Sequence, residues 1–303
     1  MEIPGIRHKK QLRAEGIARR TLARWLREDA VTSIQPWYAT PEAPPDIVAL
    51  LRLGVRPTCL DGASVHGLWT PPHTGTHVYR PRRLTAGLEL ENTRALRVRR
   101  RGGQAVPSGK AQPLVLHGPE LRAWPDLDPV PDVQLILEHA GRCLPVVKAA
   151  VLFESAMHRE MLSRRDVDRI IASLPQCARR PLARVRGDAE SGTETTVRWW
   201  FESRGVAVRS QVRFPDGRRR MDLLVGESWV IECDSREFHD DPRSYDEDRE
   251  RDLHLTSWGY TVTRLSWEQV FRRWSQTERM LLAIYRRGEY RKRPRRGEGA
   301  LVA

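Results

Sequence analysis

Three carboxylates interrupt two neighbouring apolar segments of this 303-residue chain, where charged side chains are unusual. Asp222 lies within MDLLV, and Glu232 and Asp234 lie within WVIECD. Because side chains alternate between the two faces of a strand, the three acids are expected on the faces opposite the apolar residues. Only the tripeptide GES separates the segments, which predicts an antiparallel hairpin with Asp222 near Glu232 and Asp234.

Carboxylates held close together repel one another, and each raises the pKa of its neighbours unless a cation lies between them. A divalent metal is the simplest explanation, and ligands that are all oxygen favour Mg²⁺ or Mn²⁺. The alternative is a set of ion pairs without metal, in which Asp222 pairs with Arg219 or Arg220 and Glu232 with an arginine of a helix expected at 244–258. Three buried carboxylates stabilise a fold no better than apolar residues would, which favours the metal.

The acids and the segments around them resemble a known family. It is the uncharacterised bacterial family related to very-short-patch-repair endonucleases, within the PD-(D/E)xK nuclease superfamily. The resemblance covers about residues 188–285 and implies a restriction-endonuclease-like αβββαβα core that hydrolyses DNA. The matching segments are Asp222 with Glu232-x-Asp234, SGTE at 191–194, SQV at 210–212, REFH at 236–239, DRERD at 248–252 and GYTVTRLSWEQV at 259–270.

The resemblance also implies roles for single residues. Asp222 and Glu232 would ligate the metal, and Asp234 and Glu194 would complete or orient the site. For Glu194 a second role is open, because Ser191-Gly-Thr-Glu194 before an apolar helical pattern is typical of a capping box.

The chain departs from the superfamily at one position. A lysine usually follows the glutamate by two residues, where this chain has Asp234, and no lysine occurs between Lys148 and Lys292. Arginine stays protonated near pH 7, so it could stabilise charge but could not act as a base. The substitutes are therefore Arg249 and Arg251 for charge stabilisation and His239, the first choice, or His254 for proton transfer.

The net charge of +13 is concentrated in three segments, at 1–27, 92–110 and 286–303. This clustering suits contact with a phosphate backbone, although an arginine-rich genome would also raise the charge. We therefore expect DNA as a partner and no membrane, because no apolar run approaches the roughly 20 residues that span a bilayer. The start also lacks a signal-peptide core, which predicts a cytoplasmic protein.

The first 40 residues predict a winged helix-turn-helix, with helices at 6–15 and 18–28 and a β-wing at 31–39. Residues 1–185 also loosely resemble the winged-helix and linker region of AbiE-type abortive-infection antitoxins, through GASVHGLW at 62–69 and HVYRP at 77–81. A basic helix can instead be a solvated face. The candidate DNA-binding residues are Arg19, Arg20, Arg24 and Arg27 on the second helix and Arg97, Arg99, Arg100 and Arg101 on a basic strand.

Histidines and cysteines carry little signal at this level. The cysteines are widely spaced without a CxxC pair, which argues against a zinc knuckle and a disulfide scaffold and predicts reduced packing residues. The histidines at 66, 73 and 77 lack a metal-ligand spacing and are expected to be ordinary turn or surface residues. The cysteines are Cys59, Cys143, Cys177 and Cys233.

The expected fold is α/β in four parts. We expect a Mg²⁺-dependent DNA endonuclease targeted by a DNA-binding module. The alternative is a non-catalytic DNA-binding transcriptional regulator or antitoxin-like protein with a degenerate nuclease fold; a homodimer or a toxin-like protein partner is also open. The parts are a winged helix at 1–40, a mixed α/β, antitoxin-like region at 46–185, a nuclease-like domain at 188–285 and a basic disordered tail at 286–303.

Overall fold

The protein is described here by a computed structural model. It forms two compact units, one up to Arg184 and one from Val185 onward, and each is described by itself. No helix in the described part of the chain is both long and apolar enough to cross a bilayer. The residues described are 5–81, 94–101, 104–118, 123–213, 220–234 and 242–294, with side chains described outside 94–110 and 242–248.

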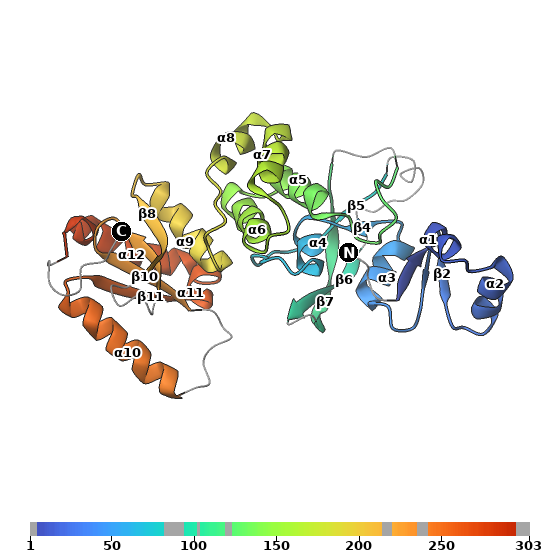
Figure 1. The fold of residues 1–303 in the computed structure, drawn as a ribbon, viewed down its shortest axis with the longest axis horizontal. Coiled ribbons are helices and arrows are strands. Elements are labelled where there is room, and N and C mark those ends of the chain that lie inside the picture. The colour runs from blue at the N-terminus through green and yellow to red at the C-terminus, as the bar shows by residue number, and fades with distance from the viewer. Residues whose placement is uncertain are drawn as a thin grey trace. The chain divides into compact units, whose positions relative to one another are not determined.

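The first unit opens with two short helices and a small antiparallel sheet of strand order β1-β3-β2 (Figure 1). The hairpin expected at 31–39 is present as β2 and β3. The helix expected at 6–15 starts only at Lys9, because residues 6–8 pair with β3 instead. The elements are β1 (Ile6–His8), α1 (Lys9–Ala14), α2 (Arg19–Arg27), β2 (Thr32–Ile34) and β3 (Trp37–Ala39).

The rest of the first unit is a mixed sheet followed by four helices (Figure 1). Its strand order is β4-β5-β7-β6, with β5 and β7 parallel and the other pairs antiparallel. The basic strand expected at 95–101 is β6, at the edge of this sheet. The elements are α3 (Pro45–Arg52), β4 (Arg56–Pro57), α4 (Cys59–Val65), β5 (Thr76–Tyr79), β6 (Arg94–Arg101), β7 (Gln104–Leu116), α5 (Val133–Cys143), α6 (Val146–His158), α7 (Arg164–Ser173) and α8 (Gln176–Leu182).

A buried arginine joins the opening segment to the mixed sheet. The side chain of Arg56 is fully buried and forms an ion pair with Asp126. Its guanidinium lies 4.9 Å from the ring centre of Trp124, 5.6 Å from that of Tyr79 and 5.9 Å from that of Trp37. Stacking on several rings and pairing with a carboxylate are the contacts that make a buried guanidinium tolerable. The segment expected to form a separate module thus shares a core with the region after it.

The second unit has the element order expected up to its fourth strand. Its sheet has the order β11-β10-β9-β8, with β10 and β11 parallel and the other pairs antiparallel. The single helix expected at 267–286 is divided into two at Arg272 and Arg273. The elements are α9 (Gly192–Glu202), β8 (Val208–Arg213), β9 (Arg220–Val225), β10 (Trp229–Asp234), α10 (Pro242–Ser257), β11 (Thr261–Ser266), α11 (Trp267–Phe271) and α12 (Trp274–Arg287).

Both faces of this sheet are covered. One face packs against apolar residues of α9 and α12, including Phe201 and Leu281. On the other face Leu224 and Val230 pack against Leu255 of α10. By alternation, Asp222 and Glu232 belong to the face covered by α10. The acids therefore lie in a covered layer, where an unpaired charge is costly.

The folded part of the second unit extends past 286, where a disordered tail was expected to begin. A short 3₁₀ helix, Glu289–Arg291, follows α12, and its Tyr290 is buried and stacks on Tyr285. The carbonyl oxygen of Tyr290 accepts a hydrogen bond of 2.7 Å from the backbone N–H of Glu227 in the β9–β10 turn. Residues 295–303 lie outside the described part of the chain.

Candidate functional site

The β9–β10 hairpin brings Asp222 and Glu232 together. Its antiparallel register runs from Trp229 opposite Val225 to Ile231 opposite Leu223, so Asp222 and Glu232 are the next residues on the two strands. The backbone N–H of Cys233 donates a hydrogen bond of 2.7 Å to Oδ2 of Asp222. The hairpin predicted from the sequence is confirmed. Together with Asp234 and Glu194 these residues are called the acidic cluster below.

Glu194 enters from the first turn of α9. Ser191 caps this helix, since its Oγ accepts a hydrogen bond of 3.1 Å from the backbone N–H of Glu194. The carboxylate of Glu194 accepts hydrogen bonds at Oε2 from the backbone N–H of Glu190, at 3.0 Å, and from Nε2 of Gln211, at 2.9 Å. Glu194 is only 3% exposed. Burial, and then the charge of Asp222, raise the pKa of Glu194 to about 7.

Glu232 is the most isolated carboxylate of the cluster. It is 4% exposed, and its Oε2 forms an ion pair of 3.1 Å with Nη2 of Arg251 on α10. Its Oε1 is buried without a hydrogen-bond partner among the described residues. Burial and the nearby charge of Asp222 raise the pKa of Glu232 to about 8, against the opposing effect of Arg251. Burial is also the main cause of the raised pKa of Asp222.

Asp234, at the end of β10, has a different environment. Its side chain is partly exposed, and its Oδ1 lies 3.4 Å from Nη1 of Arg264. The same guanidinium is held mainly by Asp252, through contacts of 2.9 and 3.1 Å. Asp234 is thus partly open to solvent, unlike the two glutamates of the cluster.

These contacts support in part each of the two hypotheses for the acids, a divalent metal site and a set of ion pairs without metal. The ion pair of Glu232 with an arginine of the following helix is present, with Arg251 as the partner. Arg220, considered as a partner for Asp222, forms its ion pair with Glu190. Among the described residues Oε1 of Glu232 is buried without a partner, which suits a cation ligand better than a completed ion-pair network, because a satisfied network leaves no such atom. The donors are all oxygen, as Mg²⁺ or Mn²⁺ requires.

The remaining candidates lie on α10 or outside the described residues. Arg249 is exposed on this helix, and the ion pair with Glu232 is made by Arg251. His254 is exposed on the same helix and stacks on Trp258. His239, the candidate for proton transfer, lies outside the described residues.

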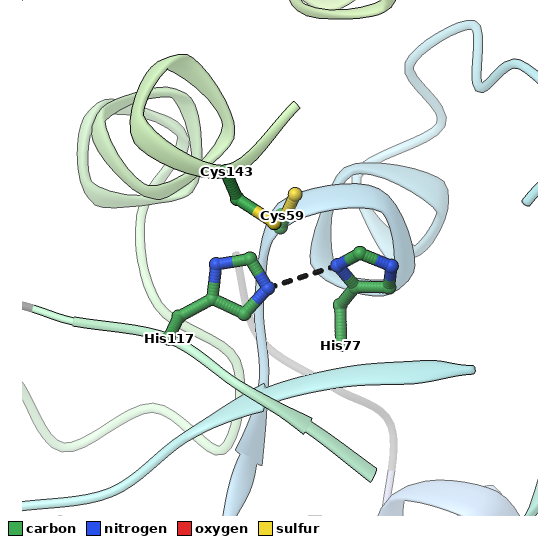
Figure 2. A group of neighbouring side chains, drawn as sticks. All are labelled: Cys59, His77, His117 and Cys143. Atoms are coloured by element: carbon green, nitrogen blue, oxygen red, sulfur yellow. Dashed lines mark hydrogen bonds between the residues drawn. The ribbon is translucent and has the colours of Figure 1, made fainter. Parts of the chain in front are cut away.

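A second cluster, in the first unit, was missed by the sequence reasoning. Among the described residues, two cysteines and two histidines each offer one ligand atom, and these four atoms all lie within 4.8 Å of one another. In the same described part of the chain, the acidic cluster forms no group this tight. Figure 2 shows the four side chains pointing toward a common centre. We call them the Cys/His cluster, which consists of Cys59, His77, His117 and Cys143.

The cluster corrects two expectations. His77 is no ordinary surface histidine, since it is buried with its Nδ1 2.8 Å from Nε2 of His117. Cys59 packs in the core as expected, whereas Cys143 is exposed and so is not a packing residue. Hydrogen bonds from Cys59 and from the two rings lower the pKa of the Cys143 thiol. Cys233 does pack in a core, and Cys177 is exposed.

No local spacing could have revealed this cluster, because its members are brought together by four elements far apart in the sequence. Cys59 begins α4 and Cys143 ends α5, while His77 lies in β5 and His117 directly follows β7. The parallel pairing of β5 with β7, which places His77 opposite Val115, brings the histidines together. Parallel pairing between distant strands is a tertiary feature that a one-dimensional pattern does not encode.

The candidate DNA-binding residues fall into two groups. The arginines of α2 are all exposed, and this helix has no acidic residue. Those at 97 and 99–101 lie on the edge strand β6, where only the backbone is described. The exposed arginines of α2 are Arg19, Arg20, Arg24 and Arg27.

Comparisons of the chain with protein-family models, with curated proteins and with solved structures found no match. The function is therefore argued from the geometry of the chain itself.

Proposed function

We propose that the second unit is a Mg²⁺- or Mn²⁺-dependent endonuclease that hydrolyses phosphodiester bonds of DNA. One observation carries the proposal. Two nearly buried glutamates from different elements, Glu194 and Glu232, lie beside Asp222 with pKa values raised to about 7 and about 8. Strongly perturbed carboxylates that converge from separate elements are typical of functional sites rather than of stabilising ion pairs.

The residues fit a hard divalent cation. Asp222 and the unpartnered Oε1 of Glu232 supply two oxygen ligands, and Asp234 is open enough to supply a third. A bound divalent ion would neutralise charge that develops on a phosphoryl oxygen. It would also offset the charge of Asp222, which after burial is the second cause of the raised pKa values of the two glutamates.

Glu194 is suited to hold a proton during hydrolysis. Its Oε2 is fixed by two donors, from Glu190 and Gln211, which leaves Oε1 as the oxygen that can take up a proton. A pKa of about 7 lets the group both accept and release protons near neutral pH. This role would compensate for the absent motif lysine. Arg251 is placed to balance negative charge beside Glu232.

Nicking of supercoiled plasmid tests the proposal directly. The purified full chain with Mg²⁺ or Mn²⁺ is expected to nick DNA, and Asp222→Asn and Glu232→Gln should each lower the rate by about 10²-fold or more. Glu227→Gln is the matched control, because Glu227 is exposed at the turn of the same hairpin. A wild-type chain that leaves plasmid intact, or a Glu232→Gln variant that cuts normally, would contradict it.

A thermal melt gives a second readout that does not depend on catalysis. A ligand that binds only the folded state raises the melting temperature. Millimolar Mg²⁺ or Mn²⁺ should therefore raise the melting temperature of the wild type and of Glu227→Gln, but not that of Asp222→Asn.

Two observations favour a second candidate, a non-catalytic DNA-binding regulator or antitoxin-like protein. Arg251 already pairs with Glu232, and the lysine position of the superfamily is taken by Asp234. In that case the full chain would bind DNA in a salt-dependent manner with no cleavage at any Mg²⁺ or Mn²⁺ concentration. The nicking assay and a binding titration on the same preparation separate the two.

A further inference from the structure

We propose that the first unit binds one structural Zn²⁺ ion through the four side chains of the Cys/His cluster. Two thiolates and two imidazoles are the donor set that zinc prefers, and four protein ligands without an open position are typical of structural rather than catalytic zinc sites. The cluster belongs to the first unit alone, so this inference is independent of the proposed nuclease activity.

The spacing of the four ligand atoms suits this ion. Tetrahedral zinc, with bonds of about 2.3 Å to sulfur and about 2.0 Å to nitrogen, separates its ligand atoms by roughly 3.3 to 3.8 Å. The ligand atoms of the cluster all lie within 4.8 Å of one another. One pair, Nδ1 of His77 and Nε2 of His117, is 2.8 Å apart, so binding requires this pair to open by only about 0.5 Å.

The two histidines face each other through ring nitrogens. In this contact of 2.8 Å one ring nitrogen donates and the other accepts. With the donor ring in its other tautomer, both nitrogens present lone pairs to a metal ion at the centre of the cluster. Both rings are nearly buried, so solvent offers no substitute partner for these nitrogens.

The backbone conformation of Cys59 indicates that its thiol has a role other than packing. Cys59 is fully buried and has a left-handed φ of +48° at the first position of α4. This conformation is strained for a residue other than glycine, and packing alone gives no reason for a cysteine there. A required thiol gives that reason, because glycine would relieve the strain but supply no ligand.

Groups around the cluster hold its members in place. Oδ2 of Asp61 accepts a hydrogen bond of 2.6 Å from the backbone N–H of His77 and lies 3.3 Å from Nε2 of His73. Oγ1 of Thr58, next to Cys59, is 2.8 Å from Nδ1 of the buried His139. These contacts hold the backbone of His77 and the residue before Cys59, and so fix where the two ligands start from the chain.

Metal analysis of the full chain, purified in the presence of reductant, tests the proposal. We expect about one zinc per chain after dialysis, as a four-ligand site predicts. Cys143→Ser and His117→Ala should each lower the zinc affinity at least about tenfold. Loss of a group that only supports a metal ligand already has an effect of this size, and loss of the ligand itself should have a larger one. Matched controls are Cys177→Ser and His158→Ala, which remove an exposed cysteine and an exposed histidine outside the cluster.

Cobalt provides a readout that requires no variant to fold. Titration of the metal-free wild type with Co²⁺ should give thiolate-to-cobalt charge transfer and the intense visible bands of a tetrahedral site, and one equivalent of Zn²⁺ should abolish both. An octahedral cobalt spectrum would overturn the proposal. So would a chain that retains no zinc, or a disulfide between Cys59 and Cys143 in the reduced preparation.

Discussion

At the scale of single residues, Asp222 sets the electrostatics of the acidic cluster. Its charge is among the causes that raise the pKa values of both Glu194 and Glu232. Its own carboxylate is fixed by the backbone N–H of Cys233. Asparagine keeps an oxygen that can accept this hydrogen bond but removes the charge. The substitution Asp222→Asn therefore removes the repulsion, together with the titration of Asp222 itself, and keeps the geometry.

This leads to a prediction about pH. Glu194 and Glu232 keep protons in the folded chain at pH values where the unfolded chain has released them, so the free energy of unfolding should fall as pH rises from about 5 to about 8. In Asp222→Asn the pKa values of both glutamates move back toward 4.5. The loss of unfolding free energy over this pH range then becomes smaller, by about 1.4 kcal/mol for each unit by which a pKa decreases. Urea unfolding at several pH values measures the slope.

The control for this experiment is Glu227→Gln, which removes the same charge from an exposed position of the hairpin. Buried His139, whose pKa is lowered to about 4, adds its own pH dependence, but it contributes equally to all variants and cancels in the comparison. An unchanged slope in Asp222→Asn would show that burial alone, without mutual repulsion, raises the two pKa values.

The acids could be predicted from the sequence, and the Cys/His cluster could not. Asp222 and Glu232 stand out because each breaks a local alternation, and a short turn fixes their pairing. The pairing of Arg251 with Glu232 was open in the sequence as one of two alternatives, because the choice depends on how α10 lies on the sheet. The two cysteines and two histidines lack any local signal, since their approach depends on tertiary contacts.

At the scale of elements, the β9–β10 hairpin positions the acids, and its turn packs against the 3₁₀ helix Glu289–Arg291. Gly226 has a left-handed φ of +58°, and a Cβ at this position would meet the carbonyl oxygen of Tyr290 at 2.5 Å. The next residue, Glu227, donates its backbone N–H to the same oxygen. The turn thus requires glycine both for its backbone conformation and for a close approach.

Replacement of this glycine should weaken the hairpin. Gly226→Ala adds a steric clash with backbone to the cost of a left-handed alanine, which alone is about 1 to 2 kcal/mol. Gly205→Ala is the control, because Gly205 has a similar φ of +73° with nothing within 4 Å of its added Cβ. Denaturant unfolding should show a larger loss for Gly226→Ala than for Gly205→Ala. Equal losses would show that the carbonyl of Tyr290 moves aside without cost.

Element boundaries were harder to predict than element types. Residues 6–8 directly precede a helix in the sequence, but they pair with β3 and form a strand. His8 then caps α1, because its Nδ1 accepts a hydrogen bond from the backbone N–H of Lys10. The helix expected at 267–286 is broken at Arg272 and Arg273, where neither proline nor glycine gives a signal. In both places tertiary packing overrides local preference.

At the scale of the whole molecule, the chain combines an exposed basic helix in one unit with an acidic cluster in the other. The chain divides between Arg184 and Val185, and the boundary implied by the resemblance lies at 185–188. The core shared by Trp37, Arg56 and Trp124 was not foreseen, because it joins segments separated by a proline-rich stretch. Each unit holds one candidate metal site with its own donor chemistry, oxygen in one and sulfur with nitrogen in the other.

The last prediction concerns DNA affinity, which we expect to depend on α2. Each phosphate contact made by an arginine steepens the double-logarithmic dependence of affinity on salt by about 0.9. The double substitution of Arg20 and Arg24 to Gln should therefore reduce the slope by about 2, measured by fluorescence anisotropy with a duplex. The control is the same change at Arg164 and Arg169, whose charges are already paired with acids on α7. An equal change of slope in both pairs would mean that net charge, rather than α2, governs binding.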